Sequence, residues 1–107
     1  MNKIAKIALA TTLLLTLGAT TASANATKGQ KLYAKKLKKD CGMTGAVVSA
    51  KHSQAEWEDI ENSGKLKEEI KTICPKASDK ALKDKYMEHY FDFFHKFAND
   101  SGNVPSC

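Results

Sequence analysis

The chain has 107 residues, a formal net charge of +5 and no arginine among its 17 basic side chains. This length is enough for one domain and no more. The small charge excess and the lack of a side chain suited to bidentate phosphate binding argue against nucleic-acid binding.

The N-terminal residues have the pattern of a secretory signal peptide. Lys3 and Lys6 precede an apolar run over 7–17 that is too short to span a bilayer as a mature helix, and an Ala-Ser-Ala sequence follows. We therefore expect a signal peptide over 1–24 and a periplasmic or secreted protein. Its single domain, 25–107, holds 15 lysines against 12 acidic residues and has no membrane-spanning segment.

The first predicted helix runs from Thr27 to about Lys39. Thr27 and Gln30 form a capping box, and the apolar stripe of the helix consists of Leu32, Tyr33 and Leu37. Lysines cover the other side, which predicts a surface for docking an acidic partner, with candidates Lys28, Lys31, Lys35 and Lys38. The alternative is that these lysines are only a solvated helix face.

Two shorter helices follow a predicted loop. Two glycines in the stretch 41–51 predict a loop whose middle tucks Val47 and Val48 inward. Ser53 and Glu56 form a second capping box, and the helix that it opens has Trp57 and Ile60 on one face and ends at Asn62, Ser63 and Gly64. The next helix runs from about Lys65 to Cys74, with an apolar face of Leu66, Ile70 and Ile73, because Pro75 prevents its continuation.

The longest predicted helix spans 79–98 after a Ser78 cap. Its apolar residues recur at helical spacing: Leu82, Tyr86, Tyr90, Phe91, Phe93, Phe94 and Phe97. We interpret this stripe as the principal core element, and the alternative is that it also forms the wall of a ligand pocket. With no repeat or linker in the chain, the sequence predicts an all-α fold, a small single-domain bundle of about four helices.

The three cysteines, Cys41, Cys74 and Cys107, predict one disulfide in an oxidising compartment. Three pairings are open, and the sequence alone does not choose among them. Because Pro105 stiffens a tail that ends in cysteine, our preferred pairing is Cys74 with Cys107, with Cys41 unpaired. A bond of this kind stabilises the fold by about 3 kcal/mol in the chain-entropy model.

The chain shows no pattern typical of a catalytic or metal site. It lacks C-x-x-C, C-x-x-C-H and H-E-x-x-H, and His89 and His95 are six residues apart, on opposite sides of a helix. Asp92 could face His95 as a surface pair. Cys41 and Cys74 are expected at helix C-termini, which disfavour a reactive thiolate. We expect no metal site and no enzymatic activity.

The sequence over 28–33, Lys-Gly-Gln-Lys-Leu-Tyr, resembles the opening of the first helix in small class I c-type cytochromes. The chain also resembles small exported bacterial proteins labelled cytochrome-c-like. The residues that carry this resemblance are Cys41-Gly42, His52, Glu56, Trp57, Ile73-Cys74-Pro75 and the segment 100–107. The resemblance implies a cytochrome-c-like helical fold and docking to a redox partner through the lysine face. The chain departs from the family because Cys41 is followed by Gly-Met-Thr-Gly, without a second thiol or an adjacent histidine.

Three functional hypotheses follow from these features. The first is a haemless binding or accessory module, a monomer that docks to an acidic periplasmic redox protein. The second is an electron carrier with non-covalent haem, held by His52 together with Met43 or Met87. The third is a disulfide-stabilised structural or interaction protein without a ligand.

Overall fold

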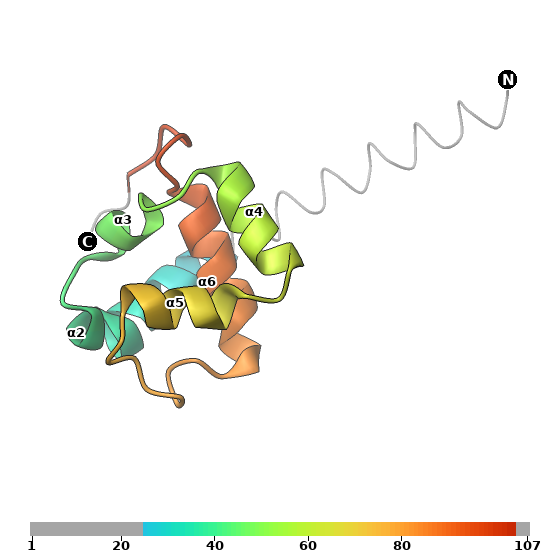
Figure 1. The fold of residues 1–107 in the computed structure, drawn as a ribbon. Coiled ribbons are helices and arrows are strands. Elements are labelled where there is room, and N and C mark those ends of the chain that lie inside the picture. Colours follow the sequence, from blue (N-terminus) through green and yellow to red (C-terminus); the bar gives the residue numbers. More distant parts are fainter. Residues whose placement is uncertain (1–24, 105–107) are drawn as a thin grey trace, which may run out of the picture.

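The computed structural model describes residues 25–104, so the predicted signal peptide over 1–24 and the last three residues lie outside the described part. Every regular element within 25–104 is helical (Figure 1). In chain order, a helix over 25–41 contains the π-helical segment η1 (Tyr33–Leu37) and ends as α2 (Lys38–Cys41). It is followed by α3 (Gly45–Ser49), α4 (Gln54–Asn62), α5 (Leu66–Ile73) and α6 (Asp84–Lys96). The all-α, single-domain prediction is confirmed.

Helix α6 passes through the middle of the bundle, and the other helices pack around it (Figure 1). Its side chains Tyr90, Phe93 and Phe94 are completely buried. Trp57 of α4 stacks on Phe94, with ring centroids 4.8 Å apart, and its indole N–H donates to the Ser49 carbonyl at 3.0 Å. The predicted role of the aromatic stripe as the main core element is therefore confirmed.

Helix α6 starts at Asp84 rather than at Asp79, which corrects the predicted boundary. The Ser78 hydroxyl does accept a cap bond, from the Ala81 N–H at 3.2 Å, but it closes only a turn. Lys83 then takes an extended conformation, which separates that turn from α6. The Tyr90 hydroxyl donates to the Ala81 carbonyl at 2.8 Å, so α6 itself holds the turn in place.

The two middle helices agree with the prediction. Ser53 and Glu56 make both bonds of the capping box at the start of α4, and α5 ends at Ile73 with Cys74 as its C-cap. Trp57, Leu66 and Ile70 are buried as their spacing predicts. Local sequence was sufficient here because a cap and a terminating residue bound each helix.

The stretch over 41–51, predicted as a loop, contains the short helix α3. The Thr44 side chain caps it by accepting from the Val47 N–H. Val48 is buried as predicted, but Val47 is 48% exposed, which corrects its expected inward position. The correction follows from helical geometry, because adjacent residues on a helix cannot both face the same core.

The first helix is already helical at residue 25, so Thr27 lies inside it rather than at its cap. It contains a π-helical turn, in which the Lys38 N–H bonds five residues back to the Tyr33 carbonyl. Tyr33 and Leu37 are both buried, as their spacing of four residues on one helix face predicts, and Cys41 at the end of the helix reaches a disulfide partner.

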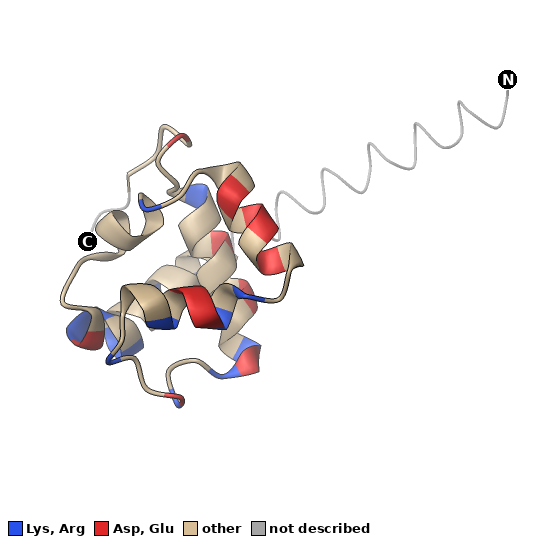
Figure 2. Cartoon of the chain, in the orientation of Figure 1, with Lys and Arg blue, Asp and Glu red and all other residues tan. Residues whose placement is uncertain are grey.

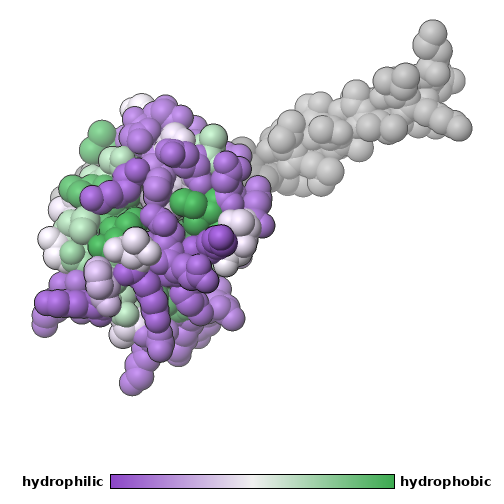
Figure 3. Space-filling model, viewed as in Figure 1, coloured by the Kyte–Doolittle hydropathy of each residue, from purple (hydrophilic) through white to green (hydrophobic). Residues whose placement is uncertain are grey.

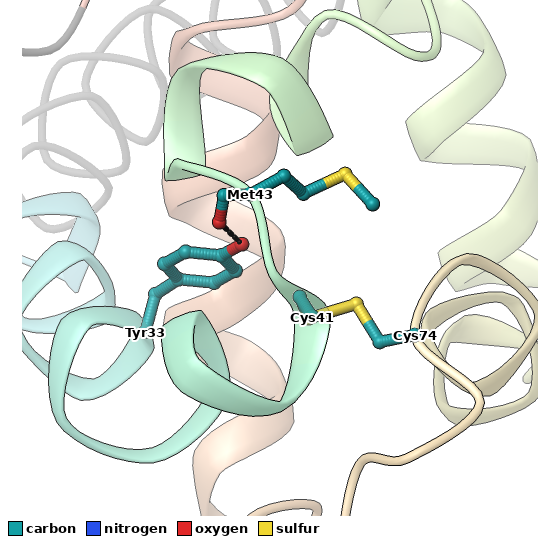
Figure 4. The surroundings of a disulfide bond; sticks show 4 residues. All are labelled: Tyr33, Cys41, Met43 and Cys74. Carbon is teal, nitrogen blue, oxygen red and sulfur yellow. Dashed lines mark hydrogen bonds between the residues drawn. A yellow bond between two sulfur atoms is a disulfide. The ribbon is translucent and has the colours of Figure 1, made fainter.

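That partner is Cys74, which corrects the predicted Cys74–Cys107 pairing and the expectation that Cys41 is unpaired. The α-carbons of Cys41 and Cys74 are 4.5 Å apart, because α2 ends beside the chain that leaves α5 (Figure 4). Cys107 lies outside the described residues. The bond joins the first helix to α5, two elements that are distant in sequence.

Candidate docking site on the first helix

The four predicted docking lysines, Lys28, Lys31, Lys35 and Lys38, are all exposed. None of the ion pairs formed within the described residues involves them. Two lysines elsewhere are neutralised instead, Lys67 by Asp84 at 3.1 Å and Lys71 by Asp79 at 2.7 Å. The first helix therefore presents positive charge that no carboxylate of the described chain offsets.

Charge is distributed unevenly over the bundle, as Figure 2 shows. Helix α4 carries Glu56, Glu58, Asp59 and Glu61 and no basic residue, whereas the helix over 25–41 carries six lysines and one aspartate. Such a separation of charge orients an approaching acidic partner toward the first helix.

A hollow of about 370 Å³ lies beside these lysines. The first helix contributes most of its lining, and α3 and α6 contribute one residue each, so that the full set is Thr27, Gln30, Lys31, Tyr33, Ala34, Lys38, Gly45 and Phe93. Of the predicted docking residues, Lys31 and Lys38 line the hollow, and Lys28 and Lys35 do not. The structure thus divides the predicted set into two lysines at the hollow and two on the outer helix surface.

Aromatic rings form the floor of the hollow. Tyr33 and Phe93 are buried, and their ring centroids are 5.9 Å apart. A β-carbon built on Gly45 would lie only 2.4 Å from the Phe93 ring, so the glycine is required for α3 to pack this closely on α6. The Tyr33 hydroxyl donates to the Met43 carbonyl at 2.5 Å and ties the segment before α3 to the first helix (Figure 4).

A second hollow of about 460 Å³ lies next to the first. Ala34 and Lys38 line both hollows, and Lys39, Gly42, Met43 and Thr44 complete the second. We call the two hollows together the lysine groove. The groove follows the first helix from Thr27 to Lys39, a rise of about 18 Å at the α-helical 1.5 Å per residue.

Sequence reasoning named Lys31 and Lys38 of this groove as docking candidates, but it did not name Lys39 and it missed the floor. Gly45 and Phe93 come from two other elements, and only packing brings them beside Tyr33. The run of lysines at positions 35, 36, 38 and 39 also gives no indication of the π-helical turn.

The disulfide is a structural feature rather than a reactive one. Cys74 is 1% exposed, and both cysteines lie at the C-terminal ends of helices. Negative helix-end dipoles disfavour the thiolate that exchange would require. The bond therefore acts as a staple between α2 and α5.

Two histidines make carboxylate contacts that bridge separate elements. His52 Nε2 lies 2.8 Å from Glu69 of α5, and His95 Nε2 lies 2.7 Å from Glu58 of α4. Asp92, which the spacing places near His95, lies one turn before it on α6, and the charge of His95 acts on this carboxylate. The close contact of the imidazole, however, is with Glu58 of the neighbouring helix.

The carboxylates of Glu61, Glu88 and Asp92 influence one another between α4 and α6. Burial raises the pKa of Glu61 above its usual range, and the charges of Asp92 and Glu88 add to this rise. Burial also raises the pKa of Asp92, opposed by a hydrogen bond from Asn25. No cluster of three or more candidate metal ligands occurs among residues 25–104.

The residues of the haem hypothesis are not arranged as a ligand pair. Glu69 engages the His52 Nε2, and the His52 ring packs edge-on against Trp57 at 4.8 Å. Met87 lines a separate hollow with Leu66 and Glu68, and Met43 lines the lysine groove. Iron ligation through Nε2 would first have to break the pair with Glu69, so this geometry does not favour haem.

Comparisons with protein families, with curated proteins and with solved structures find no match to this chain. The cytochrome-c-like resemblance therefore stays a prediction. No helix within the described part is long and apolar enough to cross a bilayer.

Proposed function

We propose that this chain is an exported accessory protein that binds an acidic partner protein through the first helix. One observation supports this most directly: Lys28, Lys31, Lys35 and Lys38 are exposed and form no ion pair with any residue of 25–104, whereas Lys67 and Lys71 are paired with carboxylates. Unpaired lysines on one helix accelerate and orient encounter with a negatively charged surface. The disulfide supports export, because such bonds persist in oxidising compartments.

A binding role is favoured over a catalytic one. His52 and His95 are held by Glu69 and Glu58, and the two described cysteines are joined to each other. None of these groups is placed as a base beside a nucleophile, which acyl-transfer or thiol chemistry would require. That the partner is a redox protein rests only on the resemblance to cytochromes.

Affinity capture with charge-reversed variants tests this proposal. The test variant is K31E/K35E/K38E, and the matched control is K65E/K76E/K80E, which changes the net charge equally at exposed lysines that form no ion pair within the described residues. We expect partners captured from periplasmic extract to be lost with the test variant and retained with the control. Capture should also weaken as salt rises from 50 to 300 mM, because salt screens exposed charges.

Thermal unfolding by circular dichroism must show both variants folded. Equal capture by the test variant and by the wild type would remove the docking role of the first helix. Equal loss in both variants would show that only net charge matters.

A further inference from the structure

The lysine groove combines an apolar floor, positive charge at its edge and an irregular helix turn. Lys31 and Lys38 lie on either side of η1 in the sequence, and Ala34 within η1 lines both hollows. π-helical turns occur frequently at functional sites. Exposed Ala34 and the aliphatic stems of Lys31 and Lys38 line the groove above the buried rings of Tyr33 and Phe93, so the groove can take up apolar groups in addition to charge.

From this geometry, and resting on the proposed function, we infer that the groove binds an acidic amphipathic helix of the partner protein. The apolar side chains of that helix enter the two hollows, and its carboxylates pair with Lys31 and Lys38. This is the helix-in-groove mode, in which residues spaced by one or two turns anchor an amphipathic helix. A groove of about 18 Å accommodates about 12 helical residues, because the rise is 1.5 Å per residue.

Charge and shape select this occupant over others. Lysines at the groove edge complement carboxylates, and two adjoining hollows along one helix suit the spaced side chains of a helix better than a compact small molecule. Membrane-surface binding requires a helix with protruding large apolar side chains. Within the described residues the only large hydrophobics that are well exposed are Val47 and Val104, and neither lies on the first helix. On the face that Figure 3 shows, hydrophilic residues cover most of the surface, and hydrophobic residues gather mainly around α3.

Two synthetic 14-residue peptides provide the test. Both are capped, glutamate-rich and helix-forming, and they differ only at two positions seven residues apart, which hold leucine in one peptide and serine in the other. Binding to the purified, isotope-labelled protein is measured by amide chemical shifts over 27–45. We expect the leucine peptide to bind about tenfold tighter, as partial burial of two leucines requires.

A variant that fills the groove without changing charge locates the binding site. Ala34→Gln places a longer side chain where the two hollows meet, and Ala55→Gln makes the same change at an exposed position of α4. We expect Ala34→Gln to remove the preference for leucine and Ala55→Gln to keep it. Both are neutral substitutions at exposed helical positions, so the fold should tolerate them.

Other results would overturn the inference in distinguishable ways. Equal binding of both peptides, lost at 300 mM salt and in K31E/K35E/K38E, would leave the proposed acidic docking intact and reject the groove as an apolar anchor. If neither peptide binds up to millimolar concentration, the groove is not a binding site for an acidic helix. The affinity-capture experiment would then still test whether the first helix docks an acidic partner. Tighter binding to phosphatidylglycerol vesicles, or a dimer in sedimentation that Ala34→Gln dissociates, would assign the groove to a membrane or to a second copy instead.

Discussion

Replacing cysteines one at a time tests the disulfide that joins α2 to α5. Cys41 and Cys74 are 33 residues apart, and Cys107 lies equally far beyond Cys74. Closing a loop of this length removes about 3–4 kcal/mol of unfolded-chain entropy. A Cys107→Ser chain should therefore unfold within about 0.5 kcal/mol of the wild type, whereas C41S/C107S should lose about 3–4 kcal/mol. Cys41 is the better site for serine because Cys74 is buried, where a hydroxyl would add its own cost.

Urea unfolding followed by tryptophan fluorescence measures this difference. Trp57 is fully buried against Phe94, so its emission reports on the core. A loss of about 3–4 kcal/mol lowers the urea midpoint by about 2–4 M for a small domain. Thiol titration of unfolded, unreduced Cys107→Ser should find no free thiol. If Cys107→Ser loses the larger amount, or if C41S/C107S unfolds like the wild type, the Cys41–Cys74 bond is refuted.

Three further predictions concern the core and its charges. Phe94→Ala should lower the unfolding free energy by about 3–5 kcal/mol, since a fully buried ring is deleted, and a loss below about 1 kcal/mol would contradict its central role. Gly29→Ala should lower the unfolding free energy by about 1–3 kcal/mol in the same urea assay, because the new β-carbon would lie 2.0 Å from the His89 carbonyl oxygen and force the first helix away from α6. Helix propensity alone predicts a gain in stability instead, and such a gain would show that the first helix and α6 pack less closely here. Burial raises the folded-state pKa of Asp92, so the stability that its protonated form contributes is lost as pH rises through that pKa. The unfolding free energy of Asp92→Asn should therefore rise relative to that of the wild type between pH 4 and pH 7. If the difference between the two unfolding free energies does not change with pH, the predicted effect of Asp92 is rejected.

Several elements could be predicted because their determinants are local. The Ser53–Glu56 capping box places the start of α4, and Pro75 places the end of α5. The spacing of Tyr90 and Phe94 on α6 indicates the buried face correctly. Each of these features depends on residues within one or two turns of each other.

The start of α6 and the helix α3 could not be predicted in the same way. Residues 79–82 have a cap and helix-forming neighbours, yet they form a turn. The Tyr90 hydroxyl of α6 donates to the Ala81 carbonyl, which a continuous helix would instead bond to a backbone N–H. Gly45 reads as a loop residue in the sequence, and its actual role is to let α3 pack on Phe93. In both places a tertiary contact outweighed local preference.

The sequence by itself determined the helical class, the aromatic core and the lysine-rich first helix, because periodicity and caps act over a few residues. Only the tertiary structure decided which cysteines pair and where the lysine groove lies. The Cys41–Cys74 and Cys74–Cys107 bonds would close loops of the same length, so chain entropy does not distinguish them. The proximity of the ends of α2 and α5 decides the pairing. The groove floor joins Tyr33, Gly45 and Phe93 from three elements, and no local pattern of residues specifies such a meeting.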